Sequence, residues 1–168
     1  MAEGVPTLGH VRGGLSLRAR RASPLSAAEF FEALPLAVLP RVPIELRGFE
    51  TLRGRGRLLK LHYGRPETHF EAWHHSSAGR LEIGLHFEGR ANLNSGALEF
   101  FRGRILEVKS ALPRAELEPW DRGWSRLYET LPAPVLDDRL VHDAGELMAR
   151  YITTLKPLLD AFSEREAS

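Results

Sequence analysis

Histidine and glutamate side chains that could bind a metal ion or transfer protons gather between His69 and Glu88. This segment holds four of the seven histidines and three glutamates, and they alternate with Phe, Ala, Leu and Ile. Such alternation is typical of strands with one apolar and one polar face, because successive side chains of a strand point to opposite sides. Strand boundaries and register therefore decide which of these groups meet.

Four strand-like runs contain or flank these residues. They span about 43–52, 57–63, 68–75 and 80–88, and the connecting segments RGRG, GRPE and SSAG favour hairpin turns. We therefore expect an antiparallel meander. The apolar residues of neighbouring runs must face one core, because a slip of one residue would turn a whole set to water.

This parity places a row of imidazoles on the opposite face. If the hairpins close symmetrically, His62 lies opposite His69, and His69 lies opposite His86. Directly opposed residues have Cβ atoms about 4.5–5.5 Å apart, so three imidazoles could converge on one zinc-like ion. Glu71 or Glu88 could then orient a ligand histidine or act as a base toward a water molecule.

The neighbouring row extends this hypothesis, and a purely structural interpretation stays open beside it. The same register places Lys60, Glu71 and Gly84 in line, and Gly84 would leave room for a substrate beside Glu71. However, histidine and glutamate are also common on solvated strand faces, and a register shift of two residues would scatter the row. A helix over this face would leave the histidines as hydrogen-bonded polar residues.

A second candidate site is the arginine-rich turn RGRGR. Arg53, Arg55 and Arg57 lie in and beside a glycine turn, where guanidinium groups and backbone amides could contact phosphate or nucleic acid. Charged residues also protect edge strands from pairing with other sheets, which is the alternative explanation.

Helical patterns flank the four runs. Ser26 and Glu29 have the spacing of a capping box, and a second helix is expected to begin at Asn94 or Ser95. Apolar residues with helical spacing predict two further helices, one through Trp120, Trp124, Leu127 and Leu131, and a long terminal one after an Asp137 N-cap. The expected fold class is α+β, with a four-stranded antiparallel meander packed on one face by C-terminal helices.

Composition limits the classes of protein to consider. The chain has 168 residues, a net charge of +1 and no cysteine, which excludes disulfides, thiolate metal sites and a thiol nucleophile. No apolar run is long enough for a membrane span or a convincing signal peptide, so we expect a cytoplasmic protein without a membrane partner. Residues 1–23 are expected to be a flexible basic tail, and residues 24–168 a single domain.

The order of several segments resembles an uncharacterised bacterial α+β domain found attached to restriction-endonuclease-like proteins. The segments are HFEAW, LEIGLHFE, EPWDRGWSRLYETLP and YITTLKPLLDAF, and the similarity spans roughly residues 68–162. The resemblance implies an association with DNA-processing or defence systems. It supplies no catalytic residues.

Two classes of function follow from these patterns. The first is a non-catalytic binding or interaction module with a protein or nucleic-acid partner, favoured because no complete catalytic set is visible in the sequence. The second is a metal-dependent hydrolase that uses His62, His69 and His86, assisted by Glu71 or Glu88.

Overall fold

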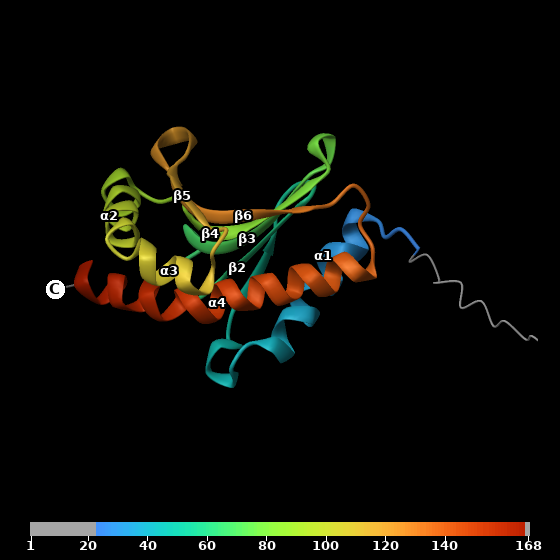
Figure 1. The fold of residues 1–168 in the computed structure, drawn as a ribbon, viewed down its shortest axis with the longest axis horizontal. Helices are drawn as coiled ribbons and strands as arrows, with labels where there is room; N and C mark the ends of the chain where they lie inside the picture. The colour runs from blue at the N-terminus through green and yellow to red at the C-terminus, as the bar shows by residue number, and fades with distance from the viewer. Residues whose placement is uncertain (1–22, 167–168) are drawn as a thin grey trace, which may run out of the picture.

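A curved antiparallel sheet with helices against one face forms the body of the protein (Figure 1). The computed structural model describes residues 23–166, so the predicted tail lies outside the described residues except for Ser23. The strands are β1 (Glu50–Arg53), β2 (Leu58–His62), β3 (Thr68–His75), β4 (Arg80–Phe87), β5 (Glu116–Pro119) and β6 (Ser125–Pro132). The α-helices are α1 (Ala27–Val38), α2 (Ala91–Arg102), α3 (Ile105–Ala111) and α4 (Asp138–Glu166).

The sheet confirms the predicted α+β class and meander and adds two strands to it. The strand order is β1-β2-β3-β4-β6-β5, and every neighbouring pair is antiparallel. The first strand is shorter than predicted, because Pro43 precedes a 3₁₀ turn at Ile44–Leu46. After β4 the chain passes through α2 and α3 before it returns to the sheet as β5 and β6.

The predicted helix through Trp120 and Leu131 is wrong, because this segment forms the β5–β6 hairpin. A tight turn at Asp121–Gly123 joins the two strands, with Arg122 at a φ of 58° and Gly123 at a φ of 74°. Beyond the turn, burial alternates with a period of two along β6, and not with a helical period. The four apolar residues fit a helical spacing by coincidence.

The predicted register of the central strands is confirmed. His62 pairs with His69, and His69 pairs with His86. In the next row, Lys60 pairs with Glu71, and Glu71 pairs with Gly84. The polar face of the central strands is therefore the one expected from strand parity.

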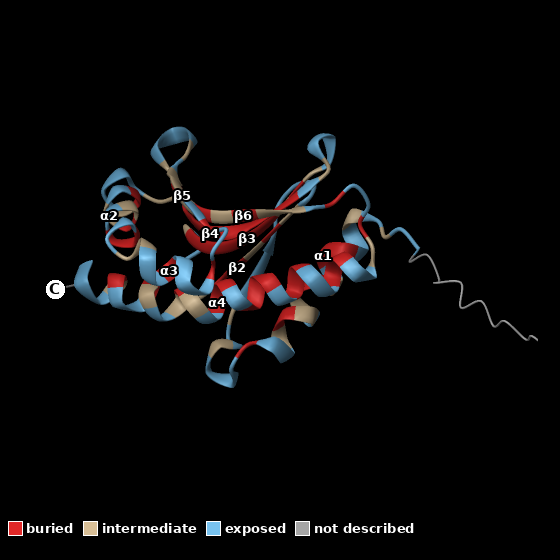
Figure 2. Ribbon diagram, viewed as in Figure 1, coloured by how far each residue is buried: buried red, intermediate tan, exposed pale blue. Residues whose placement is uncertain are grey.

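The opposite face of the sheet carries the core. Figure 2 shows buried residues along the central strands and along parts of α1 and α4. The strand residues are Leu59, Leu61, Phe70, Ala72, Leu81, Ile83, Leu85, Phe87 and Leu127. Helix α4 contributes an amphipathic stripe and begins after the predicted cap, where the Leu140 backbone amide donates to the Asp137 side chain at 2.8 Å. Among the described helices, none combines the length and apolarity that a bilayer crossing requires.

The capping box at the start of α1 gives a first testable prediction. The Glu29 amide donates to Ser26 Oγ at 3.2 Å, and the Ser26 amide donates to Glu29 Oε2 at 2.8 Å. These bonds with Ser26 hold the pKa of Glu29 below its ordinary value. Ser26→Ala should cost about 1 kcal/mol in urea unfolding and raise that pKa toward normal in an NMR titration. A shift in neither quantity would contradict the cap, and the exposed Ser95→Ala serves as a control.

Candidate metal centre

The polar face of the sheet buries a group of ionisable side chains. In Figure 1, α1 and α4 lie against the core face, and the β3–β4 and β5–β6 turns rise on the other side. The residues His69, Glu71, Glu82 and His86 on that other side are nevertheless only 1–4% exposed. The indole of Trp120 and the guanidinium of Arg126 lie over this part of the sheet, where the guanidinium carbon is 3.2 Å from the ring centre.

Four residues offer ligand atoms that lie within 4.8 Å of one another: His69, Glu71, His86 and Glu88. The Glu71 carboxylate stands between the two imidazoles. Its Oε2 is 3.1 Å from His69 Nε2, and its Oε1 is 3.9 Å from His86 Nδ1. Glu88 completes the group, with Oε1 at 3.8 Å from His69 Nε2. Nitrogen and carboxylate donors in this arrangement suit a divalent transition metal such as zinc.

The outer nitrogen of each imidazole faces an acceptor outside the group. His69 Nδ1 lies 2.7 Å from the carbonyl oxygen of Pro66, which can only accept a hydrogen bond. His86 Nε2 lies 3.2 Å from Glu82 Oε1, close enough for an ion pair but not aligned as a hydrogen bond. When a ring is neutral and its proton is on the outer nitrogen, the lone pair of its inner nitrogen is directed at Glu71. When His69 Nε2 carries a proton, it instead donates to Glu71 Oε2. Metal-binding histidines typically donate their other N–H to such acceptors.

The neighbours of Glu71 favour its ionised form. Burial opposes the charge of Glu71, but the hydrogen bond to His69 and the nearby His86 and Lys60 keep its pKa below the ordinary value. The Lys60 ammonium lies 2.6 Å from Glu88 Oε2 and 3.7 Å from Glu71 Oε2. Glu71 is thus available as a ligand at neutral pH.

Glu82 lies beside the group and links it to Arg126. Its two oxygens each accept from Arg126 Nη1 at 2.9 Å, and Oε2 lies 3.1 Å from His75 Nε2. Burial would raise the pKa of Glu82, but the contacts with His86 and Arg126 hold it below the ordinary value. Arg126 in turn binds Glu118 at 2.6 Å. This network holds the Glu82 carboxylate 3.2 Å from His86 Nε2.

The structure brings together four of the five residues predicted for the metal site. His62 is buried and pairs with His69 in the register, but it lies outside the group of four, and its Nδ1 has no hydrogen-bond partner among the described residues. Glu71, predicted as an assisting residue, occupies the centre instead. The helical spacing around Trp120 predicts a helix where the structure has the β5–β6 hairpin, so the sequence does not indicate the positions of Trp120 and Arg126 beside the group.

The three arginines of the RGRGR turn do not converge on one site. Arg53 donates to Glu32 at 3.3 Å and to the Ala28 carbonyl at 2.9 Å, both on α1. Arg57 contacts His74 Nδ1 at 2.9 Å, and Arg55 is exposed. A phosphate or nucleic-acid contact at this turn stays a prediction.

A cavity of about 280 Å³ opens beside the metal group. It contains three of the four candidate ligands on its wall, together with all three tryptophans of the chain. The lining residues are Leu58, Glu71, Trp73, His86, Glu88, Trp120, Asp121, Arg122 and Trp124. A small molecule in this cavity would lie next to the group that could hold the ion.

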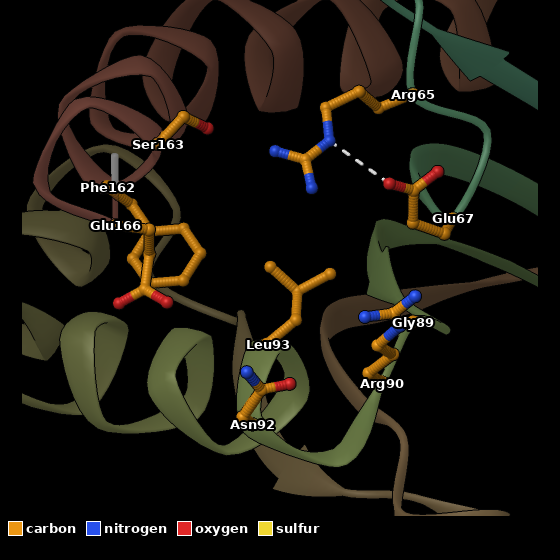
Figure 3. Close-up of a pocket in the computed structure, with 9 residues that line it drawn as sticks. All are labelled: Arg65, Glu67, Gly89, Arg90, Asn92, Leu93, Phe162, Ser163 and Glu166. Atoms are coloured by element: carbon orange, nitrogen blue, oxygen red, sulfur yellow. Dashed lines mark hydrogen bonds and ion pairs between the residues drawn. The ribbon is translucent and has the colours of Figure 1, made fainter. Parts of the chain in front are cut away.

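A larger cavity of about 640 Å³ lies elsewhere, between the β2–β3 turn, the start of α2 and the end of α4 (Figure 3). Leu93 projects into it, and the Arg65 side chain faces Phe162 and Ser163 across it. Arg65 is paired with Glu67 at 3.0 Å. The lining of this cavity includes the charged residues Arg65, Glu67, Arg90 and Glu166 and none of the four candidate metal ligands.

Comparisons with known proteins leave the function to be argued from this geometry. The chain matches no protein-family model, and no curated protein and no solved structure is significantly similar to it. The resemblance of residues 68–162 to a domain attached to nuclease-like proteins therefore stays a prediction.

Proposed function

We propose that this protein is a metal-dependent hydrolase in which His69, Glu71 and His86 hold a divalent ion and Glu88 is the general base. The observation that supports it is the orientation of the two imidazoles, whose outer nitrogens face Pro66 O and Glu82 while their inner nitrogens face Glu71. Two histidines and one glutamate form a ligand set used by catalytic zinc sites, which keep a further position for water or substrate.

The electrostatics of the group favour a bound cation. In neutral His69 the lone pair of Nε2 would face a carboxylate oxygen at 3.1 Å, and both side chains are too deeply buried for water to separate them. Such an arrangement is repulsive unless a positive charge lies between the two atoms. A proton could supply that charge and so could a divalent ion, and the experiments below distinguish them.

A divalent ion, when bound, would act as a Lewis acid and make a water molecule more acidic. Glu88 would take the proton of that water, and this role is supported by its side chain, which lines the cavity and is 18% exposed. The water oxygen would then form a bond to the electrophilic centre of an ester, and the bond to the leaving oxygen would break. Glu88 would return the proton to that oxygen, and Lys60, whose ammonium is 2.6 Å from Glu88 Oε2, would hold the carboxylate in position.

Zinc titration tests the centre itself. Calorimetry on chelator-treated protein should show one ion per chain, and His69→Ala or His86→Ala should weaken binding at least a hundredfold. The matched control is His142→Ala, because His142 is exposed on α4 and contacts Asp143. With cobalt in place of zinc, added azide should change the visible spectrum if a coordination position is open. Absence of stoichiometric zinc binding, or a cobalt spectrum that azide leaves unchanged, would overturn the proposal.

The Glu88→Gln variant tests whether Glu88 acts as the general base or as a metal ligand. We expect this variant to bind zinc within about tenfold of the wild type, yet to lose at least a hundredfold in hydrolysis, the usual size of a general-base contribution. The zinc protein would be assayed with p-nitrophenyl acetate and p-nitrophenyl phosphate. If Glu88→Gln lost zinc as completely as His86→Ala does, Glu88 would be a ligand and not the base. If neither substrate were hydrolysed faster than by His86→Ala, the hydrolase assignment would be wrong even with zinc bound.

A further inference from the structure

We infer that the tryptophan-lined cavity binds a small planar aromatic ring that carries an anionic oxygen group, such as a phosphorus oxyanion or a carboxylate. The inference rests on the proposed function, because the ion would bind the anionic group. It adds the class of ligand and the residues that recognise it.

Contacts with neighbouring side chains hold the tryptophans of the cavity wall in position. The rings of Trp73 and Trp120 lie with centres 5.8 Å apart, and Trp120 is 5.7 Å from the His86 ring. Arg126 lies over Trp120 at 3.2 Å and so restricts its movement. All three tryptophans are only half-buried, so each keeps accessible surface. Fixed indole surfaces around a cavity of about 280 Å³ favour one planar ring over a flexible chain.

The charges on the cavity wall should make the binding of an anionic aromatic ligand depend on the metal ion. Glu71, Glu88 and Asp121 contribute three carboxylates to the wall. Two cations oppose them, the Arg122 guanidinium on the wall and the Lys60 ammonium 2.6 Å from Glu88 Oε2. Without a metal ion, the remaining excess of negative charge repels an anionic ligand. A divalent ion beside Glu71 and Glu88 would reverse the balance, so the ion and the anion should each strengthen the binding of the other by the same factor.

Arg122 adds a second contact for the anionic group. Among the described non-glycine residues it alone has a positive φ, 58° with ψ 20°, and the next residue, Gly123, has a φ of 74°. The Arg122 amide donates to Asp121 Oδ1 at 2.9 Å, and the guanidinium lies 5.4 Å from the Trp124 ring centre. Positive φ at both central residues is the geometry of a type I′ hairpin turn, which the Trp124 amide closes by donating to the Asp121 carbonyl oxygen at 3.1 Å. This turn places a guanidinium at the cavity wall.

Intrinsic fluorescence measures this binding directly, because every tryptophan of the chain lines the cavity. Phenylphosphonate, benzoate and cyclohexylphosphonate would be titrated into the zinc-loaded protein and into chelator-treated protein. We expect saturable quenching by at least one aromatic anion, at least tenfold weaker without zinc. Cyclohexylphosphonate, which cannot stack, should bind at least fivefold more weakly than phenylphosphonate. The two aromatic anions distinguish a phosphorus oxyanion from a carboxylate as the preferred group.

Arg122→Asn tests the contribution of the guanidinium without a loss of folding. Asparagine tolerates the left-handed conformation, so the variant should melt no lower than the wild type, but its affinity for the preferred aromatic anion should fall about fivefold or more. The control is Arg139→Asn, since Arg139 is exposed on α4. An unchanged affinity in Arg122→Asn would overturn the role of Arg122.

The failures of the two proposals are distinguishable. Zinc binding without saturable quenching by either aromatic anion would overturn the ligand class and leave the metal centre intact. Equal affinity with and without zinc would overturn the placement of the anionic group beside the ion. Absence of zinc binding would overturn the proposed function itself.

Discussion

Glu71→Gln should abolish tight zinc binding and yet leave the metal-free protein about as stable as the wild type. Glu71 is the residue that both imidazoles face, through His69 Nε2 at 3.1 Å and His86 Nδ1 at 3.9 Å. Loss of an outer-shell partner alone typically weakens metal binding 10–100-fold, so we expect at least a hundredfold loss at this ligand. Free zinc at about 100 times its dissociation constant should stabilise the wild type by about 2.7 kcal/mol and the variant by almost nothing.

The stability of the metal-free variant decides between a metal site and a buried ion pair. If His69 is neutral, glutamine removes a carboxylate from its lone pair, and its amide can donate to Nε2 instead. If His69 carries a permanent positive charge, the same change leaves that charge buried without its partner, which costs roughly 3–5 kcal/mol. Urea unfolding at pH 8 with chelator measures the difference, and the exposed Glu99→Gln is the control. A loss of that size in Glu71→Gln would favour the ion pair and contradict the metal centre.

The register of the site could be predicted from the sequence because strands have a fixed period of two. Apolar residues such as Leu61, Phe70 and Leu85 had to share the core, and the short connections left little freedom for the pairing. His62, His69 and His86 then had to lie on the other face, as the structure shows. Strand parity does not determine the direction in which an imidazole ring points. His69 turns one nitrogen to the Pro66 carbonyl in the β2–β3 turn and the other to Glu71 on its own strand.

The contacts of Arg126 and Trp120 beside the metal group could not be predicted from the sequence. These residues belong to a segment whose apolar spacing fits both a helix and a strand. Trp120 and Trp124 are four residues apart, which indicates a helix, while Ser125, Leu127 and Glu129 alternate as in a strand. The turn residue Gly123 decides in favour of the hairpin. Once β6 lies beside β4, Arg126 pairs with His86 in the register and reaches Glu82. The cavity depends on the same hairpin, so its aromatic wall could not be expected from the sequence either.

Gly84 has a different role from the one its place in the register suggested. The sequence predicted open space for a substrate beside Glu71, but β6 approaches Gly84 from the other side. A Cβ atom at position 84 would lie 2.5 Å from Tyr128 Cβ and 2.6 Å from the Leu127 carbonyl oxygen. Opposed Cβ atoms normally lie about 4.5–5.5 Å apart, so the two strands converge here on the face that carries the metal group. The missing side chain therefore allows the sheet to curve.

Gly84→Ala should consequently destabilise the protein by about 3 kcal/mol, at the upper end of the usual cost of overpacking, because the atoms it would meet include backbone atoms that cannot rotate away. Urea unfolding followed by circular dichroism measures the loss. Gly48→Ala is the matched control, since a Cβ there would meet nothing within 4 Å. Because relief of the clash must separate β4 from β6, it should also move Arg126 away from Glu82 and weaken zinc binding. A Gly84→Ala variant as stable as Gly48→Ala, with zinc affinity unchanged, would show that the close approach of β6 does not hold the metal group in place.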